Sequence, residues 1–509
     1  MPLSRRDFLK LGGLTASAAA LSSCSVVGRE LAQHELPETL ALPTAAPAGT
    51  PTTASDPVVR LLNRAGYGPR PGDVQRATAM GLAAYLEEQL NPEAIDDAPA
   101  GLIVRSLSYY NMDISQLYAS DEPLEAARDL GVATISRALY SRRQLSEAMV
   151  EFWSDHFNIY LRKSQFMPFL KIIDDREVIR PHALGKFHDL LSAVAHSPAM
   201  LVYLDNTRNV QEQPNENYAR ELLELHTLGV DGGYTQQDVQ EVARALTGWG
   251  VQRRGPRGGQ FRFFTEAHDT GQKQVLGRTL PAGRGAEDVT DVLTILAEHP
   301  ATAHFVAGKL VRRFVADDPP AGLVERVAQT YQESDGDIKA MLRTIFLSEA
   351  FATAPPKLKR PYSFMLSAMR ALNANATAAE SGLGRWLNML GQPLFQWPPP
   401  NGYPDVAAAW AANLLPRWNF SLALVSGRMP GVEISLERLT DAAPAGAISS
   451  VQEALHFFAG LILHQPLPAA DEALFLDYIG SGPLTRPETR LRLAESVALM
   501  LASPAFQWM

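Results

Sequence analysis

The chain has little cysteine: Cys24 is the only one in 509 residues. One thiol cannot form an internal disulfide bond, so a disulfide-stapled scaffold is excluded. Haem attached through a CxxCH motif is excluded for the same reason. The fold must therefore depend on a hydrophobic core, and a chain of this length with ordinary apolar content can bury one.

Long apolar runs and basic runs are missing as well. Beyond the N-terminus, no stretch has the roughly 18 unbroken apolar residues that a membrane span needs, so any membrane attachment is expected at the N-terminus. The formal net charge is −9 and is spread along the chain without basic clusters. This distribution argues against a groove for nucleic-acid phosphates and against a patch for anionic lipids, so no nucleic-acid partner is expected.

Alternating strand patterns are scarce, whereas helical periodicity runs from Val58 through Val150 and again from Val406 to Trp508. We therefore predict an all-α fold, a large multi-helix bundle-like body with a short β-hairpin or loop insertion. The predicted organisation comprises an export signal at 1–24, a disordered Pro/Ala/Thr linker at 25–57, an N-terminal helical lobe at 58–249, a Gly/Arg-rich loop with a possible hairpin at 250–288, and a C-terminal helical lobe at 289–509.

The N-terminus carries the most specific pattern in the sequence. Residues 4–10 read SRRDFLK and precede a mild apolar run, which is typical of a twin-arginine export signal centred on Arg5 and Arg6. Such a signal is recognised by the Tat translocase, which passes folded proteins. We therefore expect the body to fold, with or without a cofactor, before it reaches the extracytoplasmic side, in the periplasm or at the cell surface.

The tetrapeptide LSSC at 21–24 resembles a lipobox, in which Cys24 would carry the lipid and become the mature N-terminus. The alternative is ordinary cleavage after the alanines at 18–20, which would release a soluble protein. The lipobox explains why the sole cysteine lies here, so a membrane anchor at Cys24 is expected. The proline-rich segment that follows would act as a flexible spacer on the order of 30 Å long.

Residues 214–249 read PNENYARELLELHTLGVDGGYTQQDVQEVARALTGW and predict two helices joined by a turn. Asn215 is a suitable N-cap for the first helix, and Gly229 is a suitable residue to follow its end. Thr235 caps the second helix, with Asp238 in the position of a capping-box acid. This helix pair is the most clearly predicted structure in the chain.

The polar side chains of the first helix allow two interpretations. Glu216, Arg220 and Glu224 follow one another at i,i+4 spacing, and on an exposed surface this ladder would stabilise the helix by roughly 0.2–0.5 kcal/mol per pair. Alternatively, Asn217, Arg220 and Glu221 point into a cleft. There, an arginine with fixed carboxylate neighbours could hold an anion or orient a water molecule.

The same stretch is similar to the signature of the bacterial family called domain of unknown function 1800. Further matching segments follow in order from about Val58 to the C-terminus: LLNRAGYGPRPGDV, FWSDHFN, HSPAMLVYLDN, HDTGQKQVLG, GKLVRRFV, KRPYSFMLSAMRAL, GQPLFQWPPPNGYPD and PRWNFSLAL. The family has no established activity, so the resemblance implies no mechanism. Its members often occur beside a second exported family, the sulfatase-like domain of unknown function 1501, which implies a partner of that kind.

His156 lies in the aromatic-rich helical segment EFWSDHFN at 151–158. A histidine among aromatic side chains is commonly a satisfied core residue, and a catalytic or ligand role is the alternative. His226 shares a helical face with apolar residues, which indicates core packing. The region has no HExxH and no Glu-x-x-His pair, so the commonest helical zinc and di-iron motifs are absent.

The composition changes between Gly248 and Asp288. RRGPRGGQ forms a basic, glycine-rich loop, and QFRFF and KQVLGRTL are expected to pair as a short hairpin. His268, Asp269 and Lys273 lie here, and loops set on rigid helices tend to carry function. The alternative is that the His-Asp pair only makes an Asx-turn.

A proline-rich segment at 396–405, QWPPPNGYPD, carries two aromatic side chains. Aromatic rings on a rigid loop could stack against sugar rings. Equally, they could pack against the protein's own core. The sequence leaves both roles open.

As an enzyme, the protein would be a hydrolase of extracellular polymer or ester substrates. His268 or His156 would act as general base, Asp269 would orient the imidazole, and Arg220 or Lys273 would stabilise developing negative charge. The predicted catalytic set is His156, Asn217, Arg220, Glu221, His268, Asp269 and Lys273.

Two alternatives remain open. In a metal-dependent form, a divalent ion would be held by His156, Glu221, His268 and Asp269, although their spacing gives no direct support. As a non-catalytic module, the protein would be a cell-surface scaffold or a binding subunit for the sulfatase-like partner. The charged and amide groups on one helix favour chemistry, and the lack of a recognised nucleophile or metal motif favours binding.

Overall fold

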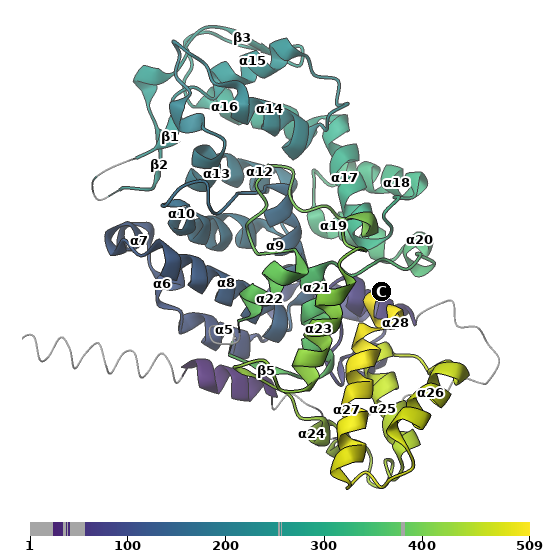
Figure 1. Ribbon diagram of the computed structural model, residues 1–509. Coiled ribbons are helices and arrows are strands. Elements are labelled where there is room, and N and C mark those ends of the chain that lie inside the picture. The colour runs from purple at the N-terminus through teal and green to yellow at the C-terminus, as the bar shows by residue number, and fades with distance from the viewer. Residues whose placement is uncertain are drawn as a thin grey trace, which may run out of the picture.

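The computed structural model describes residues 24–33, 37, 39–40, 56–252, 255, 257–377 and 382–509. Helices make up 62% of the structure, and the described residues contain only three two-stranded sheets (Figure 1). The predicted all-α class is confirmed. The predicted export motif at Arg5 and Arg6 lies outside the described residues.

The helices of the first half are α2 (Pro57–Arg64), α3 (Asp73–Met80), α4 (Leu82–Leu90), α5 (Ala98–Arg105), α6 (Ser108–Asn111), α7 (Ile114–Ser120), α8 (Pro123–Tyr140), α9 (Gln144–His156), α10 (Met167–Ile173), α11 (Arg180–His182), α12 (Phe187–Ala195), α13 (Pro198–Tyr203), α14 (Glu216–Glu221) and α15 (Gln236–Ala245). Among them, α5 to α8 lie at the left of the body in Figure 1, and α14 and α15 lie at its top. Two π-helical segments, η2 (Asp174–Ile179) and η4 (Leu222–Thr227), continue α10 and α14.

The second half is helical as well. Its helices are α16 (Glu287–Glu298), α17 (Pro300–Phe314), α18 (Ala321–Glu333), α19 (Ile338–Phe346), α20 (Glu349–Ala352), α21 (Pro361–Ala371), α22 (Leu383–Leu390), α23 (Leu414–Val425), α24 (Leu436–Asp441), α25 (Val451–Leu463), α26 (Ala469–Ile479), α27 (Pro487–Ala502) and α28 (Pro504–Gln507). A short antiparallel pair of strands, β5 (Asn375–Ala376) and β6 (Val432–Glu433), links the α21–α22 loop to the α23–α24 loop.

The predicted helix pair forms with the predicted caps. The Asn215 side chain accepts a hydrogen bond from the Asn217 backbone N–H at 2.9 Å, and Gly229 has a φ of +81° just after the helical run. Thr235 and Asp238 make the reciprocal bonds of a capping box. The sequence did not reveal that the first helix changes from α14 to the π-helical η4 after Glu221.

The predicted pairing of QFRFF with KQVLGRTL is wrong, because each segment belongs to a different sheet. β1 (Trp249–Val251) pairs with β2 (Phe261–Phe263), and β3 (Lys273–Val275) pairs with β4 (Arg278–Leu280). Between β3 and β4, Leu276 and Gly277 both have positive φ, as a two-residue hairpin turn requires. The segment KQVLGRTL therefore closes on itself.

The hydrophobic residues divide into two main cores near residue 355. The first core runs from Leu61 to Ala354 and includes Val275 and Leu280 of the β3–β4 hairpin. The second core contains α21 to α28 and also takes residues of α5 and α8. This division does not coincide with the lobes expected to meet at 250–288, because the hairpin and α16 to α20 pack onto the first core. Helix α8 contributes to both cores and ties them together.

Part of the expected linker is helical. Residues 24–33 form a helix, and Ala32 within it is 1% exposed. Gln33 donates to the Asn373 carbonyl oxygen at 3.1 Å, and the Leu40 N–H donates to the Ala442 carbonyl oxygen at 2.7 Å. The chain after Cys24 is therefore docked on the second core at these points. No helix among the described residues is long and apolar enough to span a membrane.

Candidate functional site

Three acidic side chains of α9 form one wall of a cavity where the two cores meet. Glu147, Glu151 and Asp155 are four residues apart, so they lie on one side of the helix. Their side chains are 8%, 12% and 20% exposed. Three neighbouring carboxylates are costly to bury unless cations neutralise them, so their partners determine what the site can do.

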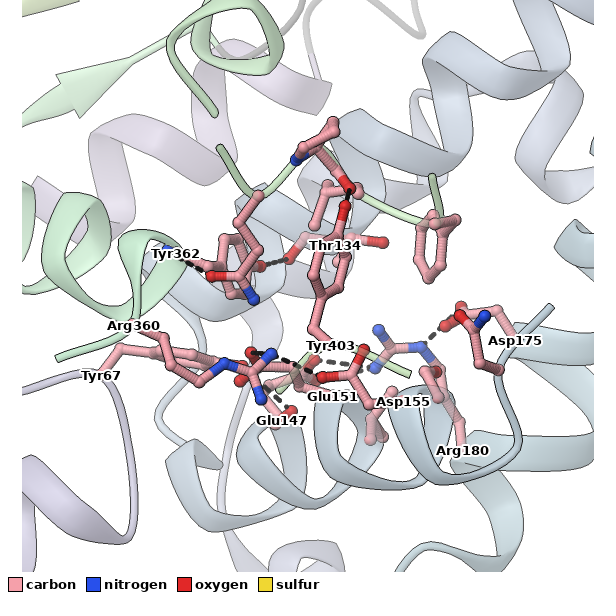
Figure 2. A pocket seen from close by; sticks show the side chains of 17 residues that line it. Tyr67, Thr134, Glu147, Glu151, Asp155, Asp175, Arg180, Arg360, Tyr362 and Tyr403 are labelled. Atoms are coloured by element: carbon pink, nitrogen blue, oxygen red, sulfur yellow. Dashed lines mark hydrogen bonds and ion pairs between the residues drawn. The ribbon is translucent and has the colours of Figure 1, made fainter. Parts of the chain in front are cut away.

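Arg180 approaches this row from one side (Figure 2). It follows the π-helical segment η2, and π-helical turns are frequent at functional sites. Its Nη1 lies 2.9 Å from each oxygen of Glu147, and its Nε donates to Asp175 Oδ2 at 2.8 Å. Tyr110 also donates to Asp175, at 2.7 Å. Arg180 therefore bridges two carboxylates from different elements.

Arg360 approaches the row from the other side and is supplied by the second core, directly before α21 (Figure 2). Its Nη2 lies 2.5 Å from Asp155 Oδ2 and 3.0 Å from Glu151 Oε1. Glu151 also accepts hydrogen bonds from Arg313 at 2.7 Å and from Tyr67 at 3.1 Å. Asp155 is the most exposed of the three carboxylates and, like Glu147, has one arginine partner among the described residues.

The cavity between these groups has a volume of about 40 Å³, which is room for a few water-sized groups. Five buried polar atoms of residues that line it have no hydrogen-bond partner among the described residues. They are Glu151 Oε1, whose only close contact is the ion pair with Arg360, and Ser154 Oγ, Asp175 Oδ1, Arg180 Nη2 and Arg360 Nε. Buried polar atoms are normally bonded, so this wall is suited to receive a small polar group.

Two carboxyl groups of the cavity differ in proton affinity. Burial raises the pKa of Asp155; Arg360 opposes this rise and the nearby charge of Glu151 reinforces it. Burial also acts on Asp175, but the attraction of Arg180 and the hydrogen bonds from Arg180 and Tyr110 outweigh it and hold the pKa of Asp175 below its ordinary value. Acid–base enzymes use such pairs, in which one carboxyl stays ionised while another holds its proton more tightly.

The proline-rich loop forms another wall of the cavity. Asn158 donates to the carbonyl oxygens of Trp397 and Pro399 at 2.9 and 2.7 Å, which fixes the loop to the end of α9. Gly402, with a φ of +72°, lies so close to α9 that a Cβ there would be 2.0 Å from the Asp155 carbonyl oxygen. Tyr403 is 9% exposed and belongs to a small apolar cluster, so the loop packs against the body and closes the site.

His156, predicted as a catalytic or ligand residue, points into the first core. Its side chain is 1% exposed among aromatic rings, and its Nε2 donates to the His226 carbonyl oxygen at 3.0 Å. Burial lowers the pKa of His156 well below its usual value, and the nearby Lys309 and His226 lower it further. An imidazole that stays neutral inside a core matches the alternative interpretation, a packed core histidine.

The predicted site on α14 is a surface ladder. Arg220 is 41% exposed and bonds Glu216 and Gln236, each at 3.0 Å. Asn217 is exposed and donates to the Leu204 carbonyl oxygen at 3.0 Å. Glu221 is partly buried, and burial together with the charge of Glu224 raises its pKa. None of these contacts involves the candidate residues of the 268–273 loop.

In that loop, His268, Asp269 and Lys273 hold the chain in place. Lys273 is buried and lies 2.7 Å from Asp288 of α16, and His268 Nε2 lies 3.4 Å from the same carboxylate. Asp269 accepts from the Gly271 N–H at 2.8 Å, which is the Asx-turn named as the alternative, and forms two bonds with Arg244 at 2.7 and 3.1 Å. The loop is therefore tied to α15 and α16 by its own candidate residues.

The four candidate metal ligands do not converge. Within the described part of the chain, no group of three or more His, Cys, Asp and Glu side chains is placed to hold a metal ion. His268 and Asp269 lie beside α15 and α16, whereas His156 is enclosed by aromatic side chains of the first core. Only His268 and Asp269, which are adjacent in sequence, are close together.

The sequence contained one unused indication of the cavity. Glu147, Glu151 and Asp155 repeat every four residues in the helical segment that also contains His156, and this spacing predicts a continuous acidic face. Nothing local indicates that Arg180 and Arg360 complete it, because they come from distant parts of the chain.

Fold and cavity together define a helical protein with a buried, charged pocket between two cores. The family model described as "Protein of unknown function (DUF1800)" matches residues 60–508, and the chain belongs to this family. No curated protein and no solved structure matches the chain.

Proposed function

We propose that the protein is an exported hydrolase whose proton-transferring group is the carboxyl of Asp155. The observation that supports this most directly is the position of Asp155. Its carboxyl has a raised pKa, is one-fifth exposed, and lies at the edge of a cavity that also holds Asp175, whose pKa is lowered, and two arginines. Groups perturbed in this way concentrate at catalytic sites.

Each neighbouring group has a defined role in this proposal. Asp155 gives a proton to the leaving oxygen or takes one from the attacking water. The unpaired Nη2 of Arg180 and Nε of Arg360 are donors toward negative charge that develops in the transition state. Because the cavity measures about 40 Å³, only a terminal or small polar group of an ester or extracellular polymer enters it.

The test is a panel of chromogenic esters and glycosides offered to the purified protein and to its Asp155→Asn variant. Cleavage by the wild-type protein that the variant loses supports the proposal. Equal cleavage by both proteins, or no cleavage of any member, contradicts it. Elemental analysis of the same preparation tests the metal-dependent alternative.

The proposed location is the outer side of the membrane, reached through the Tat translocase and held by a lipid on Cys24. Cys24 begins the docked helix at 24–33, so a lipid there would keep the body close to the bilayer. The Cys24→Ala variant is expected to move from the membrane fraction to the soluble extracytoplasmic fraction. Replacement of Arg5 and Arg6 by lysine is the control, since it should block export itself. Continued membrane fractionation of Cys24→Ala would rule out the anchor.

A second candidate is a non-catalytic surface scaffold. It is favoured by the ion pairing of the cavity, where Glu147, Glu151 and Asp175 all have arginine partners, as in purely structural networks. In this case the expected partner is the exported sulfatase-like protein of the domain of unknown function 1501 family. Co-purification with that protein, unaffected by Asp155→Asn, would separate this candidate from the hydrolase.

A further inference from the structure

A second cavity, lined by other residues than the first, lies where α2, the end of α25 and α28 meet the segment before α21. Its volume is about 220 Å³. Apolar side chains form much of its wall, among them Val59, Ile462 and Phe506. Lys359, a residue that the proposed hydrolase site does not use, also lines it.

Lys359 and Lys309 are the two lysines of the described residues that have no carboxylate at ion-pair distance, and only Lys359 lines this cavity. Six lysines have a carboxylate at ion-pair distance: Lys163, Lys171, Lys186, Lys273, Lys339 and Lys357. Within the described part of the chain, no carboxylate pairs with Lys359, although its side chain is only 4% exposed. Its Nζ lies 3.7 Å from the ring centroid of Phe506.

Two arginines lie near Lys359, whereas the carboxylate of Asp56 acts on His464 of the same cavity. Arg417, fully buried on α23, donates to the Lys359 carbonyl oxygen at 2.8 Å, and Arg60 of α2 lines the same cavity. Burial first, and then the charge of Arg417, lower the pKa of the Lys359 amine to about 7. His464 also lines the cavity; burial lowers its pKa to about 4, so its imidazole is uncharged at neutral pH.

We propose that Lys359 is a nucleophilic amine that forms an imine with a small aldehyde or ketone bound in this cavity. A buried lysine in an apolar pocket beside another cation is an established way to activate an amine for this chemistry. The apolar wall suits the hydrocarbon part of the carbonyl compound, and the volume of about 220 Å³ lies just below the roughly 300–1,000 Å³ of pockets for drug-sized ligands, which favours a small compound.

The reaction balances without an added oxidant or reductant. Neutral Nζ forms a bond to the carbonyl carbon, and the carbonyl oxygen takes a proton from nitrogen to give a carbinolamine. The carbinolamine then loses its hydroxyl group and the second nitrogen-bound proton as water, which leaves the imine. This site is independent of the proposed hydrolase, so either can fail without the other.

The test is reductive trapping of the full-length protein with butanal and cyanoborohydride at pH 7, followed by peptide mass spectrometry. At pH 7 about half of an amine with a pKa near 7 is neutral, against a fraction on the order of 10⁻³ for an ordinary lysine. We therefore expect Lys359 to be labelled at least about tenfold faster than Lys163. Its labelling rate should level off above pH 7.

Three controls make the outcome decisive. Unfolding the protein in urea should remove the preference, because the cavity is lost. Lys309, which also lacks a carboxylate partner but does not line this cavity, should be labelled more slowly than Lys359. The Lys359→Arg variant removes the primary amine and should lose only this label. Labelling of Lys359 at the rate of Lys163 or Lys309 would overturn the proposal.

Discussion

The Arg360→Met variant is expected to lose about 3–5 kcal/mol of unfolding free energy at pH 7. Arg360 is 5% exposed and is the only cation in contact with Asp155 among the described residues. Its removal leaves the Asp155 carboxylate partly buried without a partner and takes one of two cations from Glu151. Equilibrium unfolding in urea measures the loss directly, and the midpoint should fall without a change of slope.

Arg220→Met is the matched control for this variant. Arg220 also pairs with a glutamate at 3.0 Å, but it is 41% exposed. Exposed helical pairs of this type contribute roughly 0.2–0.5 kcal/mol, so the control should unfold almost like the wild-type protein. Similar losses of unfolding free energy in the two variants would show that burial of the Arg360 pair does not increase its contribution to stability.

The cost of losing Arg360 should depend on pH. In the wild-type protein the pKa of Asp155 is already raised, and the loss of its cation removes the main opposing influence. A carboxyl whose folded pKa exceeds its unfolded value destabilises the fold at pH values above that pKa. The difference between Arg360→Met and the wild-type protein should therefore shrink as the pH falls and Asp155 becomes protonated.

The helical fold could be predicted because its causes are local. Capping residues such as Asn215, Thr235 and Asp238 act on backbone groups within three positions, and each was found in its expected role. The hairpin pairing was mispredicted because two alternative partners were available to KQVLGRTL. The close turn at Leu276 and Gly277 favoured the partner within the same segment.

The site could not be predicted in the same way, because its members meet only through the tertiary fold. Arg180 and Arg360 reach the α9 carboxylates from residues that are distant in sequence, and neither position carries a local pattern. Asp155 and His156 are adjacent, yet they point to opposite sides of α9, one to the cavity and one to the first core. The prediction centred on His156 therefore lay on the helix that lines the cavity, but on the face that packs into the first core.

The candidate residues of α14 and of the 268–273 loop show a related difficulty. Arg220 and Asp269 both have partners of opposite charge. In a sequence, neighbouring residues of opposite charge are easily taken as the groups of an active site. In the structure the Arg220–Glu216 pair is an exposed ion pair on a helix, and the Arg244–Asp269 pair fixes a loop to α15. Both are common structural roles of ion pairs. Burial, which the sequence does not give for a charged side chain, separates the Arg220 ladder from Glu151. Asp269 is 20% exposed, as Asp155 is, and differs from it in its two bonds to Arg244 and its Asx-turn.

The Asp155→Asn variant is expected to lower kcat/KM for a cleaved substrate by about 10²–10⁴-fold, the usual contribution of a positioned acid or base. Asparagine keeps the shape of the side chain and can still bond Arg360, so the fold should persist. Thermal unfolding of the variant checks this point. Asp335→Asn is the control, because Asp335 is 75% exposed, pairs with Lys186 and has a positive φ that asparagine tolerates.

The pH profile distinguishes proton transfer from a positioning role of Asp155. If the protonated carboxyl donates to the leaving group, the wild-type rate falls as the pH rises through its raised pKa; if the carboxylate acts as base, the rate falls as the pH drops through it. In either case Asp155→Asn should lose that limb of the profile, and Asp335→Asn should keep it. A variant that is slower but retains the wild-type limb would mean that Asp155 only orders Arg360 and its neighbours, and another group would have to transfer the proton.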